Sequence, residues 1–329
     1  MKKIIASLFF ISFCVCLSFS QAPGLFRIGT GGLQGVYYPI GKLIAQGLTA
    51  RFLGPDKPAG IPETLFVAQT SGGSISNVQS LLSKETEAGL VQADVAYWAY
   101  TRQGPFEGLA EPAPVRAIAS LYPEKMQIVV RKDARIETFD QLKGKTISLD
   151  EAGSGTLAVL RILLEAHRLS EKDLKPVYLK PEFTVDRLMR NELQGFCMMA
   201  GVPALAIERL TSVDYSIVPI DPTVAERIQG QHPYLFPGVI PAGVYQGIGQ
   251  TPTIEVYALL VVHQDLPDEM AYGLTGGLWS KRVLSLLETG HAQGASITLY
   301  TALDGLSIPL HPGAYRFYAE RGMVSKQEP

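Results

Sequence analysis

Glycine is concentrated in one short stretch near the start of the chain, FRIGTGGLQGVYYPIG at residues 26–41. Phe26–Ile28 is typical of a short strand, and four glycines follow within seven residues. From Val36 onward the apolar residues recur at helical spacing. A strand, a bare loop and a helix start together aim free backbone N–H groups at one point, which suits an anion or a carboxylate. The alternative is a tight turn that uses glycine only for its dihedral angles.

The spacing of these glycines argues against a nucleotide site. Gly29, Gly31 and Gly35 form G-x-G-x-x-x-G, which is one residue longer than the dinucleotide-binding fingerprint, and the lysine of a P-loop is missing. Tyr37 and Tyr38 place two large amphipathic rings beside the loop. Such rings suit the wall of a small-molecule pocket.

The same order of elements returns farther along the chain. Strands are expected at residues 64–69, 88–91 and 146–149, each leading through a loop into a helix. Ser74 begins one of these helices and is explained by N-capping alone, because serine is a favoured cap. The rhythm predicts an α/β fold, and its repetition around the glycine-rich loop at 153–156 predicts two lobes that face one another.

Proline and glycine mark the expected breaks between elements. Residues 116–121 and 126–132 are expected as separate strands, divided at Tyr122, Pro123 and Glu124. Residues 232–253 are dense in proline and glycine and are expected to form a long loop. The apolar run at 253–263 predicts a buried strand that crosses back to the first lobe. Helices are expected at residues 185–193 and 204–210, on either side of a strand at 195–199.

Residues 1–22 have the composition of a cleaved secretion signal. Lys2 and Lys3 precede an apolar run that ends in small residues, with cleavage expected after Ser20 or Ala22. The apolar run is short for a membrane anchor. The mature chain is therefore expected to be exported and soluble, and together with the family resemblance given below this implies the periplasm of a two-membrane bacterium. It keeps one cysteine, Cys197, which lies in an apolar run and is expected to be a buried core thiol.

Charge and motif content argue against two other classes of protein. Without Lys2 and Lys3 the chain carries 27 basic and 31 acidic side chains, so nothing suggests a nucleic-acid partner. Ser154 stands in AGSGT, which has Ala152 and Thr156 at the two positions where the hydrolase motif G-x-S-x-G requires glycine. The five histidines are scattered and show no metal-ligand spacing. We therefore expect no catalytic residue, no metal and no cofactor.

Several motifs occur together in the order of a known family, and they span nearly the whole mature chain. Besides the opening glycine stretch, they are SGGSISN (71–77), LVQADVAY (90–97), SLYPE (120–124), GSGT (153–156), GVPALAI (201–207) and PLHPGAYRFYAE (309–320). In this respect the chain resembles the TAXI family, the extracytoplasmic solute receptors of TRAP-type transporters. The resemblance implies a type II periplasmic-binding-protein fold. Lobe I would comprise residues 23–124 and 255–329, lobe II would comprise residues 125–254, and the chain would cross the hinge twice.

The resemblance also implies a carboxylate clamp in the second lobe. Its backbone N–H groups and hydroxyls would come from one loop, made of Gly153, Ser154, Gly155 and Thr156. Helix capping alone would explain either hydroxyl but not the two glycines.

The remaining implied contacts lie across the cleft from the clamp or at its back. Side chains able to hydrogen-bond an amino, amide or carboxylate group are Tyr38, Ser74, Asn77 and Gln92. The walls would include Gly31, Gly32, Tyr37, Val202 and Pro203. Glu124 would lie at the lobe boundary, where it could pair either with a ligand ammonium or with a hinge lysine.

The function implied by the family is capture of a small acidic metabolite, with glutamate, glutamine and 2-oxoglutarate as the candidate ligands. We favour glutamate because the implied pocket combines an anion-binding helix start with amide and carboxyl side chains. The receptor is expected to be a monomer that delivers its ligand to a TRAP-type permease. A periplasmic sensor subunit is the alternative, since the same cleft could serve a signalling partner. A secreted serine hydrolase is the least favoured hypothesis.

Overall fold

The computed structural model describes residues 23–325, so the predicted signal segment 1–22 lies outside the described residues. Its α-helices are α1 (Tyr37–Phe52), α2 (Ser74–Leu82), α3 (Ala93–Thr101), α4 (Gly155–Ala166), α5 (Pro181–Met189), α6 (Leu205–Glu208), α7 (Pro222–Gln231), α8 (Asp268–Leu278), α9 (Lys281–Gly290) and α10 (Pro312–Ala319). Its strands are β1 (Gly24–Gly29), β2 (Thr64–Gln69), β3 (Ala88–Gln92), β4 (Val115–Arg131), β5 (Thr146–Ser148), β6 (Lys175–Val177), β7 (Gly195–Ala200), β8 (Tyr215–Ile217), β9 (Phe236–Ile240) and β10 (Thr251–His263).

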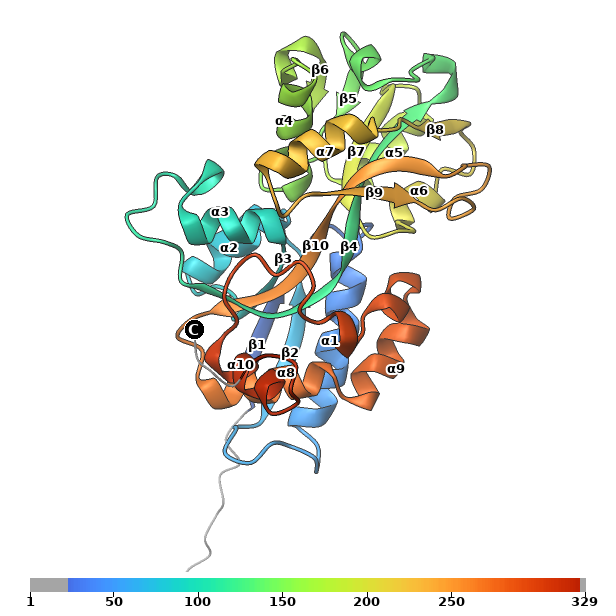
Figure 1. Ribbon diagram of the computed structural model, residues 1–329. Coiled ribbons are helices and arrows are strands. Elements are labelled where there is room, and N and C mark those ends of the chain that lie inside the picture. The colour runs from blue at the N-terminus through green and yellow to red at the C-terminus, as the bar shows by residue number, and fades with distance from the viewer. Residues whose placement is uncertain (1–22, 326–329) are drawn as a thin grey trace, which may run out of the picture.

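The strands form one mixed sheet that runs through two lobes (Figure 1). Its order is β2-β1-β3-β10-β4-β7-β5-β6, with β8 added to β4 and β9 added to β10. Strands β1, β2 and β3 are parallel in the first lobe, and β5, β6 and β7 are parallel in the second. The predicted α/β fold with two lobes is confirmed.

The long antiparallel strands β4 and β10 join the lobes. They have 17 and 13 residues and pair along most of their length, from Lys125 opposite Glu255 to Val115 opposite His263. Lys125 and Glu255 also form an ion pair. The expected lobe boundaries at 124/125 and 254/255 fall inside these strands and stay a prediction.

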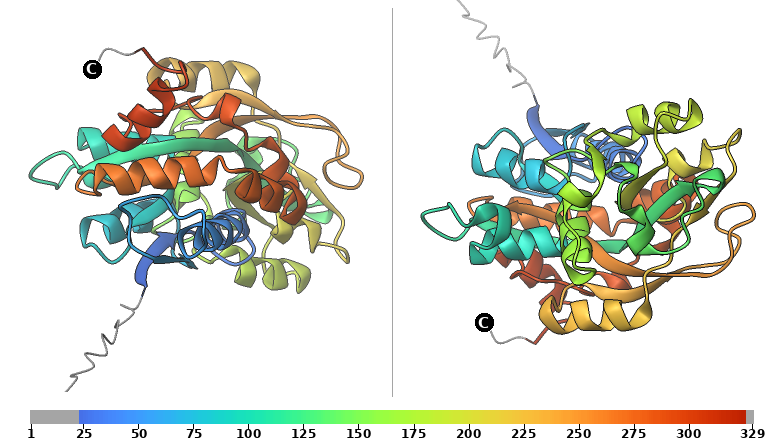
Figure 2. Two further views of the ribbon diagram at one scale, coloured as in Figure 1. Left: turned by 90° about the horizontal axis from the view of Figure 1, so that it is seen from below. Right: turned by 90° about the horizontal axis from the view of Figure 1, so that it is seen from above.

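Helices cover both faces of the sheet, and each face carries one hydrophobic core that continues from lobe to lobe (Figure 2). The first core includes Ile28 in one lobe and Val185 in the other. The second core includes Val78 in the first lobe and Leu160 in the second lobe. It also contains the buried thiol of Cys197. The hinge is therefore a pair of packed strands. Across residues 23–325, no helix is both long and apolar enough to span a membrane.

Two predictions about local structure are wrong. Residues 116–121 and 126–131 belong to the single strand β4, and Pro123 lies opposite Tyr257 within its ladder. The register shifts one pair beyond this proline, between Ala258 and Leu259, and sheets tolerate proline near such irregularities.

The expected loop at 232–253 contains a strand, β9, which pairs with the start of β10. Its Pro237 is accommodated because β9 pairs on one side and lies at an edge of the sheet. The helix expected at 185–193 runs instead from Pro181 to Met189, and the one expected at 204–210 shortens to Leu205–Glu208.

Candidate ligand-binding site

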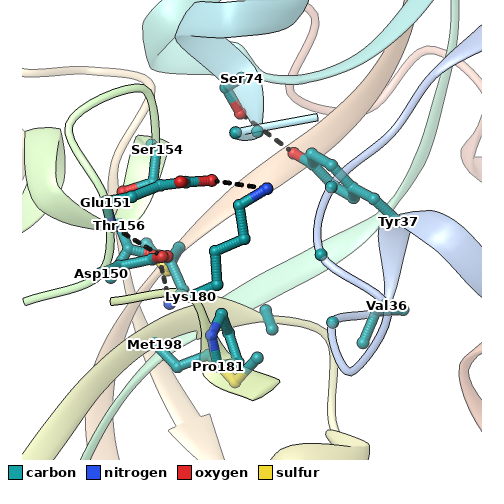
Figure 3. Close-up of a pocket in the computed structure, with 18 of the residues that line it drawn as sticks. Val36, Tyr37, Ser74, Asp150, Glu151, Ser154, Thr156, Lys180, Pro181 and Met198 are labelled. Carbon is teal, nitrogen blue, oxygen red and sulfur yellow. Dashed lines mark hydrogen bonds and ion pairs between the residues drawn. The ribbon is translucent and has the colours of Figure 1, made fainter. Parts of the chain in front are cut away.

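A cavity of about 60 Å³ lies between the lobes, where the loops after β1, β2, β3, β5 and β6 meet the middle of β4 (Figure 3). A single water needs about 10–15 Å³ of such space, so the cavity matches a small ligand and not an extended one. Among the residues expected at the site, those that line the cavity are Gly31, Gly32, Tyr37, Ser74, Gln92, Glu124, Ser154, Gly155 and Thr156.

Five other expected residues do not line this cavity. Tyr38 follows Tyr37 in α1, and successive helical side chains point in different directions, so only the first ring turns inward. Asn77 is fully buried, and its amide donates to the backbone oxygens of Thr30 and Leu90 at 2.7 Å each, which ties β1 to β3. The remaining three are Gly153, Val202 and Pro203.

These three residues contact other parts of the chain. The Gly153 carbonyl accepts a hydrogen bond from the Ser76 N–H at 3.3 Å, across the two lobes. Val202 precedes Pro203 through a cis peptide bond, and its N–H donates to Gln293 at 3.0 Å.

Sequence reasoning missed several lining residues. They include Asp150, Glu151, Lys180, Pro181, Met198, Met199 and Ala200. All of them lie at, or just beyond, the carboxyl ends of β5, β6 and β7. Ligands of open α/β sheets bind at that edge, so the position of these residues after predicted strands is a signal that could have identified some of them.

The lobes are in direct contact around the cavity. Besides the bond from Ser76 to Gly153, the Leu33 N–H donates to Glu182 at 3.3 Å, and the Ala206 N–H donates to the Gln34 carbonyl at 3.3 Å.

Two glycines permit this approach. A Cβ on Gly153 would lie 2.1 Å from the Ser76 hydroxyl oxygen, and a Cβ on Gly155 would lie 2.2 Å from Gln92 Oε1. Any side chain at either position would force the opposing residue to move.

The hinge side of the cavity carries a buried acid. Glu124 is 2 % exposed, and its Oε2 accepts a hydrogen bond from the Tyr37 hydroxyl at 2.9 Å. Burial raises the pKa of Glu124 to about 8, with Asp94 adding to the rise and hydrogen bonds from Tyr37 and Gln92 opposing it. The lysine next to it in the hinge, Lys125, pairs with Glu255.

Acidic groups outnumber basic ones around the cavity. Burial raises the pKa of Asp150 to about 7, and it does the same for Asp94, which is fully buried beside the site. Among the described lining residues the carboxyls are Glu124, Asp150 and Glu151, whereas Lys180 is the one cation. A positive group placed here would favour the ionised form of these acids.

The opposite wall presents hydrogen-bond donors. Helix α4 begins at Gly155, and the Ser154 hydroxyl caps it by accepting the Leu157 N–H at 3.1 Å. The first N–H groups of a helix have no acceptor within that helix, and Gly155 and Thr156 both line the cavity. Gln92 Oε1, which lies over Gly155, is buried and has no hydrogen-bond partner in residues 23–325. A carboxylate and an amino group of one ligand would satisfy this wall and the acids together.

Metal and nucleophile chemistry have no assembled site in the described part of the chain. Within residues 23–325, no three His, Cys, Asp or Glu side chains are grouped so as to hold a metal ion. No histidine lies among the described residues that line the cavity, so Ser154 has no imidazole base there.

Several solved structures share this two-lobe architecture. A Bordetella bronchiseptica RB50 protein matches with a TM-score of 0.54 at 15 % identity, over 93 % of this chain and 91 % of its own. The binding component of an ABC phosphonate transporter from Pseudomonas aeruginosa matches with a TM-score of 0.51 at 10 % identity, over 86 % and 83 %. A Xanthomonas citri protein bound to ATP matches with a TM-score of 0.51 at 11 % identity, over 92 % and 100 %. At these identities the likeness concerns the fold.

The chain thus has the two-lobe fold seen in the binding component of a phosphonate transporter. Residues 28–322 match the model of the NMT1-like family, and the chain belongs to that family.

Proposed function

We propose that this protein is an extracytoplasmic solute receptor that closes its lobes on a small amino acid and presents it to a membrane permease. The observation that carries the proposal is the cavity between the lobes, with the buried acid Glu124 on one side and the start of α4 on the other. Ligand binding would shift the lobes from open to closed, because only the closed form offers both walls to one molecule.

The charges around the cavity refine the choice of ligand. An α-amino group would pair with Glu124 and Asp150, and an α-carboxylate would accept from the N–H groups of Gly155 and Thr156. Glutamate and glutamine carry both groups. 2-Oxoglutarate lacks the ammonium and would leave the acids without a partner, so we place it behind the two amino acids. Glutamate remains our preferred ligand.

Sequence motifs and structural similarity suggest different types of permease partner. The TAXI-type motifs favour a TRAP-type permease, whereas the Pseudomonas aeruginosa structure belongs to an ABC transporter. We favour the TRAP type because the motifs span nearly the whole mature chain. A gene for an ATP-hydrolysing subunit beside this one would favour the ABC type. The predicted secretion signal at residues 1–22 is our reason for proposing a periplasmic location.

A thermal-shift screen of the purified protein tests the ligand class. Amino acids, dicarboxylates, keto acids and sugars would be added one at a time, since a ligand that binds only the folded state raises the melting temperature. We expect glutamate or glutamine to give the largest rise. A rise with neutral sugars only would refute the proposal. If no compound gives a rise, mass spectrometry of the denatured protein shows whether a co-purified amino acid already fills the site, and absence of one would also refute it.

A further inference from the structure

Lys180 is a cavity residue with a weakly held charge. It precedes α5 as the helix N-cap, and its side chain extends across the cavity (Figure 3). The Nζ atom lies 3.4 Å from Glu151 Oε1 and 3.4 Å from the Ser71 carbonyl oxygen, which belongs to the other lobe. Charge-assisted hydrogen bonds of lysine are about 2.7–2.9 Å long, so both contacts are loose. The ammonium is thus free to move toward a better partner.

The surroundings of Lys180 differ from those of Glu124. Glu124 is buried at the hinge and bonded to Tyr37, whereas the Lys180 side chain is 31 % exposed and comes from the second lobe. Glu151, its present partner, is itself 29 % exposed. An amino acid bound by its α-groups between Glu124 and α4 would have its side chain left to reach other lining groups. Lys180 is the one cation among the described residues available there.

We propose that Lys180 is the specificity-determining residue of the site and that it leaves Glu151 to pair with a second acid group on the ligand side chain. The inference rests on the proposed function, because it takes an amino acid as the ligand. It identifies the preferred ligand as an amino acid with an acidic side chain, and it makes Glu151 a competitor of that ligand for the same ammonium.

A purely structural role would give a different pattern. If the contacts of Lys180 with Glu151 and Ser71 only held the lobes together, loss of either charged side chain would weaken binding of every ligand alike. If Lys180 selects the ligand, the two losses act in opposite directions. Lys180→Gln removes the group that the ligand needs, whereas Glu151→Gln frees that group from its competitor.

The experiment is calorimetric titration of glutamate and glutamine into wild type, Lys180→Gln, Glu151→Gln and the control Lys172→Gln. Lys172 is an exposed lysine of the same lobe outside the cavity. We expect Lys180→Gln to weaken glutamate at least tenfold and glutamine less than threefold. We expect Glu151→Gln to tighten glutamate about threefold by removing the competing charge, and Lys172→Gln to change neither ligand.

The outcomes separate the inference from the proposed function. Equal loss of glutamate and glutamine in Lys180→Gln, or weakening of glutamate in both cavity variants, would overturn the specificity role. If Lys180→Gln fails to fold, as judged by circular dichroism, Lys180→Met replaces it, because methionine keeps the apolar stem. Failure of the wild type to bind either amino acid would overturn the proposed function and the inference with it.

Discussion

The loop between β1 and α1 and the loop between β5 and α4 are built alike but present different groups to the cavity. Each connects the carboxyl end of a parallel strand to a helix start. Helix α1 has Val36 as its N-cap, with no side-chain cap, and its first residue, Tyr37, sends its hydroxyl to Glu124. Helix α4 is capped by Ser154 and turns the backbone of Gly155 and Thr156 to the cavity. The first loop thus supports the buried acid Glu124, whereas the second supplies N–H donors next to the carboxyls of Asp150 and Glu151.

The difference shows that a glycine-rich strand–loop–helix unit does not by itself determine which charge it binds. In the first unit the helix begins with a tyrosine, whose side chain lines the cavity. In the second, glycine at the same place leaves the backbone accessible. A ligand with both an amino group and a carboxylate would therefore have acids for the first group and the backbone of Gly155 and Thr156 for the second.

The largest expected effect on ligand affinity comes from removing the charge of Glu124. Glu124→Gln keeps an acceptor for the Tyr37 hydroxyl but removes the charge that would pair with the ligand ammonium. We expect glutamate affinity to fall by about 100-fold, or about 3 kcal/mol, as when one partner of a buried charge pair is lost. Calorimetry checks the change, with the exposed Glu63→Gln as the control. Unchanged affinity would show that the acid does not contact the ligand.

The donor side is tested by adding one methyl group. Gly155→Ala places a Cβ against Gln92, so the lobes should no longer close fully, and we expect glutamate affinity to fall by about tenfold. Helix stability should change little or improve, since alanine favours helices more than glycine. Gly230→Ala in α7 is the matched control, because nothing lies within 4 Å of its added Cβ. Equal affinities in the two variants would contradict close approach at Gly155.

The smallest expected effect is the pH dependence of stability. Burial raises the pKa of Asp94 to about 7 and that of Glu124 to about 8. At pH values between the ordinary carboxyl pKa and these raised pKa values, the folded state holds more protons than the unfolded state. Their contribution to stability is therefore full at low pH and is lost as pH rises through that window. Without added ligand, the melting temperature should fall by a few degrees between pH 5 and pH 8 from this cause.

Two measurements connect this pH dependence to the site. Asp94→Asn should flatten the fall in melting temperature below pH 7, and an unchanged profile would exclude Asp94 as its source. A ligand ammonium would lower the pKa of Glu124, so glutamate binding near pH 7 should release protons. Calorimetry in buffers of different ionisation enthalpy detects that release, and proton uptake would contradict the pairing.

Features that depend on residues close together in the sequence were predictable, and features that depend on distant residues were not. The strands and helices around the glycine loops were predictable because local periodicity and glycine placement define them. Cavity residues such as Tyr37, Ser74 and Ser154 could be located because they belong to those same loops. The continuity of β4 through Pro123 was not predictable, since it depends on pairing with the distant β10.

The acidic character of the site was also hidden in the sequence. Asp150 and Glu151 read as ordinary loop residues, and only the folding of β5 beside β7 and the meeting of the lobes bring them to the same cavity as Glu124. Asn77 shows the opposite error. Its amide suits a ligand in sequence terms, but the fold uses it to hold two strands together. Burial and long-range partners decided both cases.

The most direct test of the account compares glutamate with 2-oxoglutarate by calorimetry on the wild-type protein. The two molecules share a carbon skeleton and two carboxylates, and they differ in the ammonium that the acidic wall would bind. We predict that glutamate binds at least about 100-fold more tightly, consistent with a buried charge pair. Equal affinities, or tighter binding of 2-oxoglutarate, would contradict the claim that this cavity selects its ligand through Glu124 and its neighbouring acids.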